Sequence, residues 1–409
     1  MGTSLRDQGL AVKAAARELA GASNEQRSGV LRRVARELAE REEELLAINS
    51  AEVARYTEGG AGRDRLTLTP SRIASMIEAL VNLSEEPDPL FELVDERRRP
   101  NGLVARRIRV PLGVVGVVYE NRPNVTSDVA GLCVKSGNAA FLRGSSSALE
   151  SNRFIAGLFR AALVAEGLSE SGVSLVEDVS HETAAEFMGL TGVIDCLIPR
   201  GGPSLIRAMR EHARVPYVLD GDGNCHVYVD APSDLDQALV IVVNAKTSRP
   251  GVCNAAETLL VHRDVAPEFL PRLVEEMPEV ELRGDEATRA LVAATPVTEE
   301  DYAQEFLDLI LAVRVVDSLE EAIDHVARYG TGHSEAIVTT DEAHAETWVR
   351  RVDAAAVVVN ASTRFVDGGE LGLGGEVGIS TQKLHARGPM GLRELTCVKW
   401  VLLGEGQVR

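Results

Sequence analysis

The sequence predicts an α/β fold with two doubly wound, parallel-sheet domains and an arm made of a β-hairpin and the C-terminal segment. From residue 114 onward, short apolar runs of β type alternate with amphipathic helical segments, which is the pattern of repeated βαβ units. Around Pro100-Asn101-Gly102, two runs that alternate in polarity flank an Asn-Gly turn, which is typical of a hairpin.

Length and composition limit the functional classes. The chain has 409 residues, enough for two or three domains, and a formal net charge of −19. This charge argues against nucleic acid as the main partner, although 97–99 and 106–109 are locally basic. No apolar run approaches the roughly 20 residues that span a bilayer, and residues 1–10 lack the apolar core of a signal peptide. We therefore expect a cytoplasmic protein without a membrane contact.

The first domain begins with helices and continues as a parallel sheet. Ser23 and Gln26 form a capping box, and Pro70 after Thr69 starts another helix. The hairpin runs cover residues 94–99 and 103–110. The expected strands of the first sheet then follow: 114–119, 139–142, 173–175, 193–198 and 215–219. Ligands of such sheets bind beyond the carboxyl ends of the strands.

The second domain begins near residue 246. A helix at 234–246 leads into a loop with a cysteine, and the alternation of strands and helices then resumes. The expected strands are 257–261, 313–316, 336–338 and 355–360. Residues 362–391 are rich in glycine and polar side chains, and 394–403 form a last strand-like run.

One of the five cysteines is placed as a nucleophile would be. Cys253 follows the turn at Pro250-Gly251, and Lys246 and Arg249 are near enough in sequence to favour a thiolate. A packing cysteine is the alternative. The odd number of cysteines and the absence of a C-x-x-C pair argue against a disulfide framework or a zinc site. Cys225 and His226 suggest a dyad, but neighbours in a strand point to opposite faces.

Two loops that follow strands of the first sheet resemble phosphate sites. Each has an arginine and then small residues that open a helix, where backbone N–H groups and the helix dipole favour an anion. Together they indicate a dinucleotide, although neither is G-x-G-x-x-G. The residues of the two loops are Arg143, Gly144, Ser145, Arg200, Gly201 and Gly202. Asn124, after the first strand, either caps a helix or donates to a developing oxyanion.

Several longer motifs resemble the γ-glutamyl phosphate reductases (glutamate-5-semialdehyde dehydrogenases), a branch of the aldehyde dehydrogenase superfamily. The matching segments are 110–119, 122–126, 135–138, 198–202, 225–230, 249–254, 257–261, 359–365 and 380–392. The resemblance extends from about residue 5 to the end, and its last two segments are specific to this branch.

The resemblance implies an aldehyde-dehydrogenase-like fold with defined parts. Residues 1–95 and 111–245 would form an NADP-binding domain, 246–375 a catalytic domain, and 96–110 with 388–409 an oligomerisation arm. It also implies NADPH-dependent reduction of L-glutamyl 5-phosphate to L-glutamate 5-semialdehyde and phosphate through a cysteine thioester. This is the second step of proline biosynthesis from glutamate, and no metal takes part.

Site residues follow from the resemblance position by position. Cys253 falls on the catalytic cysteine, Asn124 is an oxyanion candidate, and Glu305 matches a glutamate that holds a cofactor ribose, with a solvated helix-start residue as the alternative. The residues expected to bind substrate are Arg122, Asn254, Ser362, Thr363, Arg364, Lys383, His385 and Arg387.

Partners and alternatives complete the sequence-based expectations. The chain would form a homo-oligomer, a dimer or tetramer, and a separate glutamate 5-kinase would supply the labile acyl phosphate. One alternative is an oxidative NAD(P)-dependent aldehyde dehydrogenase for another small aldehyde, and another is a non-catalytic nucleotide-binding protein. The acidic position of the oxidative relatives aligns near Asp220. If Asp220 faced the thioester, hydrolysis of the thioester to glutamate would be expected; the alternative is a turn residue.

Overall fold

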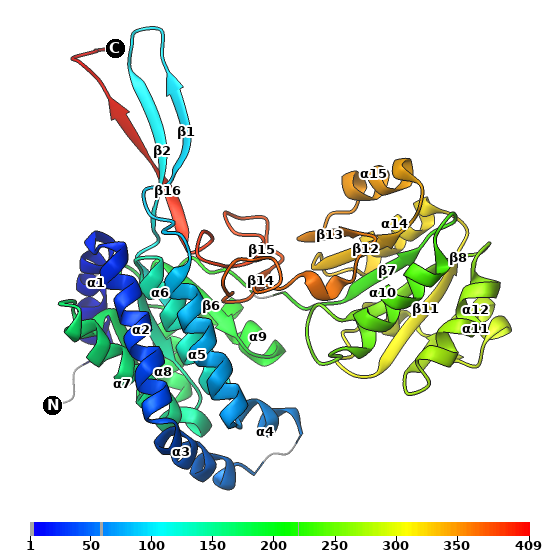
Figure 1. Cartoon of the computed structure of the whole chain (residues 1–409), viewed down its shortest axis with the longest axis horizontal. Helices are drawn as coiled ribbons and strands as arrows, with labels where there is room; N and C mark the ends of the chain where they lie inside the picture. The colour runs from blue at the N-terminus through cyan, green and yellow to red at the C-terminus, as the bar shows by residue number, and fades with distance from the viewer. Residues whose placement is uncertain (1–3, 58–59, 220) are drawn as a thin grey trace. The chain divides into compact units, whose positions relative to one another are not determined.

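The structure, a computed structural model, describes residues 4–57, 60–219 and 221–409 of the chain. The chain folds into two compact units. Unit 1 contains residues 1–219, 372–378 and 390–409, and unit 2 contains 220–371 and 379–389. Each unit holds its own parallel sheet (Figure 1). The predicted α/β fold class is confirmed.

Unit 1 contains a four-stranded parallel sheet in the order β5-β4-β3-β6, counted over the described residues. Its strands are β3 (Val114–Tyr119), β4 (Ala139–Arg143), β5 (Val173–Leu175) and β6 (Cys196–Arg200). All six residues of β3 are buried, as expected for a central strand with both faces covered.

Helices surround this sheet. The α-helices of unit 1 are α1 (Leu5–Gly21), α2 (Asn24–Glu40), α3 (Glu42–Arg55), α4 (Ala61–Leu66), α5 (Pro70–Glu85), α6 (Pro123–Lys135), α7 (Leu149–Ala165), α8 (His181–Met188) and α9 (Pro203–His212), and the 3₁₀ turns are η1 (Ser146–Ala148) and η2 (Glu170–Gly172). The capping box of Ser23 and Gln26 is present, and the Thr69 side chain caps α5, so both predicted helix starts are confirmed.

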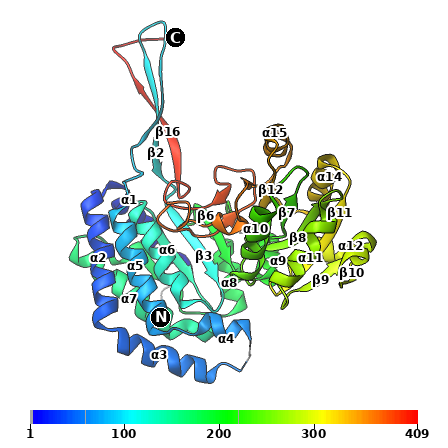
Figure 2. The same ribbon diagram turned by 45° about the vertical axis from the view of Figure 1, so that its right-hand side comes forward.

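The arm is a three-stranded antiparallel sheet within unit 1. Strand β1 (Leu93–Arg98) pairs with β2 (Val104–Pro111), and β2 pairs along its whole length with β16 (Thr396–Leu403). In both ribbon views the three strands extend away from the α/β body of the unit (Figures 1 and 2). The predicted hairpin and the predicted last strand are therefore confirmed.

Unit 2 contains a parallel sheet of seven strands, counted over the described residues, in the order β10-β9-β11-β8-β7-β12-β13. Its strands are β7 (Cys225–Val229), β8 (Ala256–His262), β9 (Glu281–Gly284), β10 (Thr295–Pro296), β11 (Ile310–Val316), β12 (Ser334–Val338) and β13 (Ala356–Val359). The helices are α10 (Leu235–Thr247), α11 (Ala266–Glu276), α12 (Glu286–Leu291), α13 (Glu299–Ala303), α14 (Leu319–Tyr329) and α15 (Glu342–Arg351). The 3₁₀ turn η3 (Thr363–Phe365) and the pair β14 (Ile379–Ser380) and β15 (Gly388–Pro389) complete it.

Two sequence-based expectations about the fold are wrong. The second unit begins directly after Leu219 and not near residue 246, because β7 pairs with β8 and β12 and therefore belongs to the second sheet. The expected strand at 215–219 is reduced to a single bridge between Tyr217 and Leu197. In addition, the short elements β9, α12, β10 and α13 were not expected from the sequence.

Within the ranges that the structure covers, none of the helices combines the length and the hydropathy that crossing a bilayer requires.

Candidate active site

The carboxyl edge of the unit 1 sheet carries the predicted cofactor loops. Glu120 follows β3, Gly144 follows β4, and Gly201 follows β6, so all three loops leave the sheet at the same edge. Two residues separate β6 from helix α9, and η1 with α7 begins shortly after β4. Helix N-termini therefore lie at this edge, as an anion site requires.

A carboxylate already lies at the N-terminus of α9. The backbone N–H of Gly202 donates to Oε2 of Glu120 over 3.0 Å. A Cβ atom at Gly201 would lie 2.6 Å from Cδ of Glu120, so any side chain there would displace the Glu120 carboxylate. The contact shows that this helix start accepts an acidic group, and binding of a cofactor phosphate there stays a prediction.

The loop after β4 is held by side-chain contacts. Arg143 donates through Nη2 to the carbonyl oxygens of Val179 at 2.6 Å and Ser180 at 2.9 Å, and burial lowers the pKa of its guanidinium. Ser145 donates through Oγ to Oδ1 of Asn121 at 2.9 Å. Arg143 thus has a structural role, and binding of a cofactor phosphate by this arginine stays a prediction.

Helix α6 positions Asn124 and follows Arg122, its N-cap residue. Asn124 donates through Nδ2 to Oδ2 of Asp128 at 3.0 Å. Burial raises the pKa of Asp128 to about 6, while the Asn124 hydrogen bond and the charge of Arg200 lower it. The expectation that Asn124 caps the helix is wrong, because Asn124 lies inside the first turn of α6, the N-cap residue is Arg122, and no side chain of the described residues caps this helix. Its role toward an oxyanion stays a prediction.

In unit 2, Cys253 lies before the amino end of β8 and not at a carboxyl end. Its side chain is partly exposed, whereas Cys133, Cys196 and Cys225 are buried and Cys397 lies in the arm strand β16. The general rule for ligands of open α/β sheets therefore does not apply to this residue. Partial exposure is what a nucleophile requires and a packing cysteine does not.

The backbone of Cys253 is fixed by the segment that precedes β7. A Cβ atom at Gly223 would lie 1.6 Å from the carbonyl oxygen of Cys253, so only glycine fits there. Oε1 of Glu305 accepts a hydrogen bond from the Gly223 N–H at 2.9 Å. Glu305 thus holds the loop over the cysteine, and its predicted role toward a cofactor ribose stays a prediction.

Cys225 supports the same carbonyl group. Its Sγ donates to the Cys253 oxygen at 3.1 Å, and its histidine contact is with Nδ1 of His333 at 3.6 Å. Burial raises the pKa of the Cys225 thiol well above its usual value, which keeps the thiol protonated as a donor. His226 instead contacts Glu335 at 2.9 Å, so the expectation that Cys225 and His226 diverge is confirmed.

A fully buried ion pair lies behind the cysteine loop. Lys246 contacts Oε2 of Glu257 through Nζ at 2.7 Å, and Oε1 of Glu257 accepts from the Leu307 N–H at 3.1 Å. Burial raises the pKa of Glu257 to about 7 and lowers the pKa of Lys246. Because Glu257 compensates its charge, Lys246 is not the cation that favours a thiolate at Cys253, as the sequence had suggested.

Arg364 is the cation that the fold places near Cys253. Burial lowers the pKa of its guanidinium, Asp367 and the Cys253 sulfur raise it, and Arg249 lowers it. Its Nε donates to Oγ of Ser248 at 3.2 Å. Arg364 therefore interacts electrostatically with the Cys253 sulfur, and a thiolate would be stabilised by it.

Residues from two distant segments meet beside the cysteine. Thr363 donates through Oγ1 to the Asn254 carbonyl at 2.7 Å, and Asn254 donates through Nδ2 to the Val366 carbonyl at 3.0 Å. Oδ1 of Asn254 is buried without a hydrogen-bond partner among the described residues. Oγ of Ser362 accepts from the Arg364 N–H. The structure therefore brings four predicted substrate residues together with Cys253.

Of the remaining predicted substrate residues, Arg122 is the N-cap residue of α6 in unit 1, and Lys383, His385 and Arg387 lie in the segment between β14 and β15. Lys383 and Arg387 both pair with Asp353, in the case of Arg387 at 2.8 Å, and His385 is exposed. Asp220 lies outside the described residues. Within these residues, no group of three or more His, Cys, Asp or Glu side chains could hold a metal ion.

Known proteins share both the sequence and the fold. The model of the aldehyde dehydrogenase family matches residues 7–312 and 309–401. The γ-glutamyl phosphate reductase of Heliobacterium modesticaldum is 52% identical over 408 residues, which cover 98% of each chain, and that of Thermobifida fusca is 52% identical over 401 residues, 97% of this chain and 96% of its own.

Solved structures agree with the sequence matches. The crystal structure of γ-glutamyl phosphate reductase from Thermotoga maritima has a TM-score of 0.95 at 45% identity, over 98% of this chain and 99% of that one. An acetylating aldehyde dehydrogenase from Geobacillus thermoglucosidasius has a TM-score of 0.70 at 19% identity, over 99% of this chain and 97% of that one, which shows similarity of fold alone.

Proposed function

This chain belongs to the aldehyde dehydrogenase family and, within it, to the γ-glutamyl phosphate reductases, and we propose that Cys253 is the nucleophile of its reaction. The enzyme reduces L-glutamyl 5-phosphate to L-glutamate 5-semialdehyde with NADPH and releases phosphate, a step of proline biosynthesis. The observation that supports Cys253 is its partly exposed side chain in a loop fixed by Gly223 and Cys225 and placed near Arg364.

The proposed chemistry begins at the sulfur. The Cys253 thiolate attacks the acyl carbonyl carbon and forms a C–S bond, and the bond between this carbon and the phosphate oxygen breaks as phosphate leaves with the electron pair. The resulting thioester must be protected from water, since hydrolysis would release glutamate. NADPH, when bound, supplies the hydride that reduces this thioester. Breaking of the C–S bond then releases the aldehyde and restores the thiolate.

Charge develops on the carbonyl oxygen in both halves of this reaction. We assign its stabilisation to the Cys253 backbone N–H and to the Asn124 side chain. Asn124 uses one amide hydrogen on Asp128, which fixes the amide plane and leaves its second hydrogen for the oxyanion. Arg364, with Ser362, Thr363 and Asn254, is assigned to the anionic substrate.

The other substrate residues remain assigned by resemblance. Lys383 and Arg387 share Asp353 as an ion-pair partner, and exposed pairs of this kind exchange readily for another anion. Their proposed role, together with Arg122 and His385, is to bind the phosphate or the amino-acid end of the substrate.

Cofactor binding is assigned to the unit 1 loops. The residues there fit a dinucleotide phosphate, because the Gly202 N–H at the start of α9 already binds a carboxylate. Gly201, Gly202 and Arg200 would hold one phosphate group, and Gly144 and Ser145 with Arg143 would line the neighbouring loop. Glu305 is assigned to a ribose.

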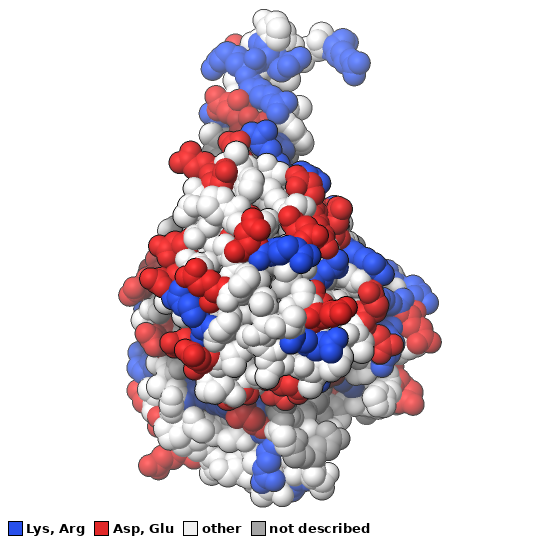
Figure 3. Space-filling view, turned by 90° about the vertical axis from the view of Figure 1, so that its right-hand side faces the viewer, with Lys and Arg blue, Asp and Glu red and all other residues white. Residues whose placement is uncertain are grey.

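We assign the arm to self-association. Apolar side chains of β16 are exposed, among them Val398 at 43%, Trp400 at 53% and Leu402 at 62%. Lys and Arg side chains also gather on the arm (Figure 3), where 97–99 and 106–109 are rich in arginine. An exposed apolar strand with basic neighbours suits an acidic second copy. Sedimentation should give a dimer or tetramer. The separate kinase and the cytoplasmic location stay predictions.

The function is tested by the reverse reaction. Purified protein is given glutamate 5-semialdehyde and NADP, and NADPH formation is followed spectrophotometrically with and without phosphate. Phosphate-dependent formation of NADPH is expected, because phosphate is the group that cleaves the thioester. Phosphate-independent formation of an acid would instead identify an oxidative aldehyde dehydrogenase. Binding of NADPH without any turnover would identify a non-catalytic nucleotide-binding protein.

A further inference from the structure

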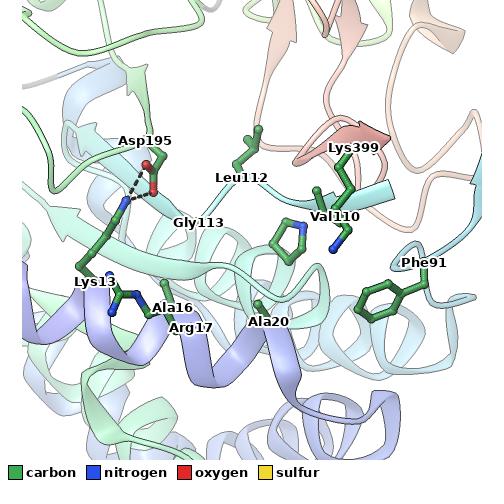
Figure 4. Close-up of a pocket in the computed structure, with 11 residues that line it drawn as sticks. Lys13, Ala16, Arg17, Ala20, Phe91, Val110, Leu112, Gly113, Asp195 and Lys399 are labelled. Carbon is green, nitrogen blue, oxygen red and sulfur yellow. Dashed lines mark hydrogen bonds and ion pairs between the residues drawn. The ribbon is translucent and has the colours of Figure 1, made fainter. Parts of the chain in front are cut away.

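A pocket of about 380 Å³ lies in unit 1 between α1 and the base of the arm. Its volume is in the range of small-ligand sites. Figure 4 shows Lys13 and Arg17 of α1 at one side and Lys399 of β16 with Phe91 at the other. No residue assigned above to the cofactor or the substrate lines it, so an inference about this pocket does not rest on the proposed reaction. Lys399 belongs to β16, the arm strand assigned above to self-association.

The pocket has an excess of positive charge. Its one carboxylate, Asp195, pairs with Lys13, whose Nζ lies 2.5 Å from Oδ2, and also accepts from the Val114 N–H at 2.8 Å. The Asp195 carboxylate is therefore already bound by Lys13 and the Val114 N–H. Arg17 and Lys399 have neither a hydrogen-bond nor an ion-pair partner among the described residues, which leaves two uncompensated cations facing one pocket.

Lysine is rare in this chain, which makes Lys399 unusual. The five lysines are Lys13, Lys135, Lys246, Lys383 and Lys399. Lys135 bonds to Ser28 and to the Ser84 carbonyl, Lys246 and Lys383 pair with carboxylates, and Lys13 pairs with Asp195. Lys399 alone among them lacks a partner within the described ranges, in a chain whose net charge is −19.

Phe91 adds an exposed aromatic ring under backbone strain. Its φ of 63° lies in the left-handed region, which is rare for a bulky residue, and its side chain is 57% exposed. The Phe91 N–H donates to the Arg109 carbonyl at 2.9 Å, which ties this conformation to the arm. Ala16 and Leu112 provide further apolar lining. Strain of this kind together with exposure is typical of ligand-binding positions.

We propose that this pocket binds a small organic anion that joins a phosphate or another strong acid group to a flat apolar body. Arg17, at one side of the pocket, binds the acid group through a planar pair of donors, and Lys399, at the other side, adds to the positive charge of the pocket. The flat body lies on the Phe91 ring and the apolar lining, and its binding shields the ring from water. An acid group without the body gains only the attraction of the positive charges and binds more weakly.

The test uses the full-length protein and three probes, namely phenyl phosphate, inorganic phosphate and phenol, titrated by calorimetry and by saturation-transfer NMR. Phenyl phosphate should bind most tightly. The double variant Arg17→Ala/Lys399→Ala should weaken phenyl phosphate binding at least tenfold. Phe91→Ala should reduce the affinity for phenyl phosphate to that for inorganic phosphate. Because the reaction site also takes phosphate, the binding that survives in the double variant is attributed to that site and subtracted.

Arg6→Ala is the matched control, since Arg6 is an exposed arginine of the same helix that does not line the pocket. It should leave all three affinities unchanged. Crystals soaked in phenyl phosphate should show it against Arg17, Lys399 and Phe91. Equal weakening by Arg6→Ala, or undiminished binding by the double variant, would overturn the proposal. A change of oligomeric mass in the double variant without a change of anion binding would also overturn it and assign the pocket to a second copy of the chain.

Discussion

The two parallel sheets present opposite edges to their candidate sites. In unit 1, the residues assigned to the cofactor follow the carboxyl ends of β4 and β6, and helices begin there. In unit 2, Cys253 and Gly223 precede the amino ends of β8 and β7, and helix α10 ends a few residues before Cys253. One edge therefore offers helix N-termini, and the other offers the C-terminus of a helix.

This difference determines which residues each site needs. A helix N-terminus attracts anions through its dipole and free N–H groups, so small residues suffice around a phosphate, as Gly202 shows with Glu120. A helix C-terminus repels a thiolate. The unit 2 site must therefore supply positive charge from side chains, and Arg364 does so. Substitution of a charged side chain should therefore matter more at the unit 2 site than at the helix N-termini of unit 1.

The largest effect is expected from Cys253→Ser. The hydroxyl of serine is far less acidic than a thiol and is a much weaker nucleophile at neutral pH, so turnover should fall by about 10³-fold or more. The reverse assay with phosphate measures this loss, and circular dichroism checks the fold. Cys397→Ser, in the arm strand, should keep the wild-type rate. Near wild-type turnover by Cys253→Ser would contradict the assignment of Cys253 as the nucleophile.

The second effect tests the backbone frame of the cysteine. In Gly223→Ala, the new methyl group would collide with the Cys253 carbonyl and displace the loop, and a shift of about 1 Å should cost roughly 100-fold in kcat. Gly157→Ala is the control, because a Cβ atom there meets nothing within 4 Å. It lies inside α7 and should stabilise the protein by about 0.5–1 kcal/mol without changing kcat. Equal kcat for both variants would show that the contact of Gly223 with the Cys253 carbonyl is not needed for catalysis.

Local patterns in the sequence predicted most elements of both sheets. The Asn-Gly turn identified the hairpin, and Ser23 with Gln26 identified the start of α2. The predicted position of the domain boundary was wrong because the apolar run of β7 resembles the strands of the first sheet. Only the pairing of β7 with β8 and β12 assigns it to unit 2. Strand pairing joins distant segments, which periodicity does not reveal.

The candidate site was predicted to a similar extent. Cys253 stood out by its turn, and the loops at Arg143 and Arg200 stood out by arginine and small residues. The contact of Gly223 with Cys253 and the thiol of Cys225 at the same carbonyl were not predicted. These contacts join residues 28–30 positions apart in the sequence, and no sequence pattern indicates that they meet. The pairing of Lys246 with Glu257 reversed an expectation for the same reason.

The third effect tests the source of positive charge in unit 2. Arg364→Ala removes a guanidinium that interacts with the Cys253 sulfur, so less thiolate should form and alkylation of Cys253 by iodoacetamide should slow about tenfold at pH 7. Arg364→Lys should keep much of the rate, because it keeps the charge. Lys383→Ala, whose ammonium pairs with Asp353, is the control and should alkylate at the wild-type rate. An unchanged rate in Arg364→Ala would refute the role of the guanidinium.

The smallest effect concerns the buried polar groups of the unit 2 core. Burial, aided by the charges of His226 and Arg314, lowers the pKa of His325 to about 2, from an ordinary 6.5. Below pH 6.5 the unfolded chain binds a proton at this position that the folded chain refuses, so the free energy of unfolding falls as the pH falls. The slope approaches about 1.4 kcal/mol per pH unit.

His325→Gln removes this titration and keeps an acceptor for Arg314, which now donates to Nδ1 of His325. We expect the stability of the variant, measured by urea unfolding between pH 7 and pH 5, to fall less steeply than that of the wild type. His181→Gln, at an exposed position of α8, should leave the slope unchanged. Parallel curves for the wild type and His325→Gln would mean that His325 carries the same charge in both states. The unit 2 core would then tolerate a buried cation, as it does at Lys246 beside Glu257.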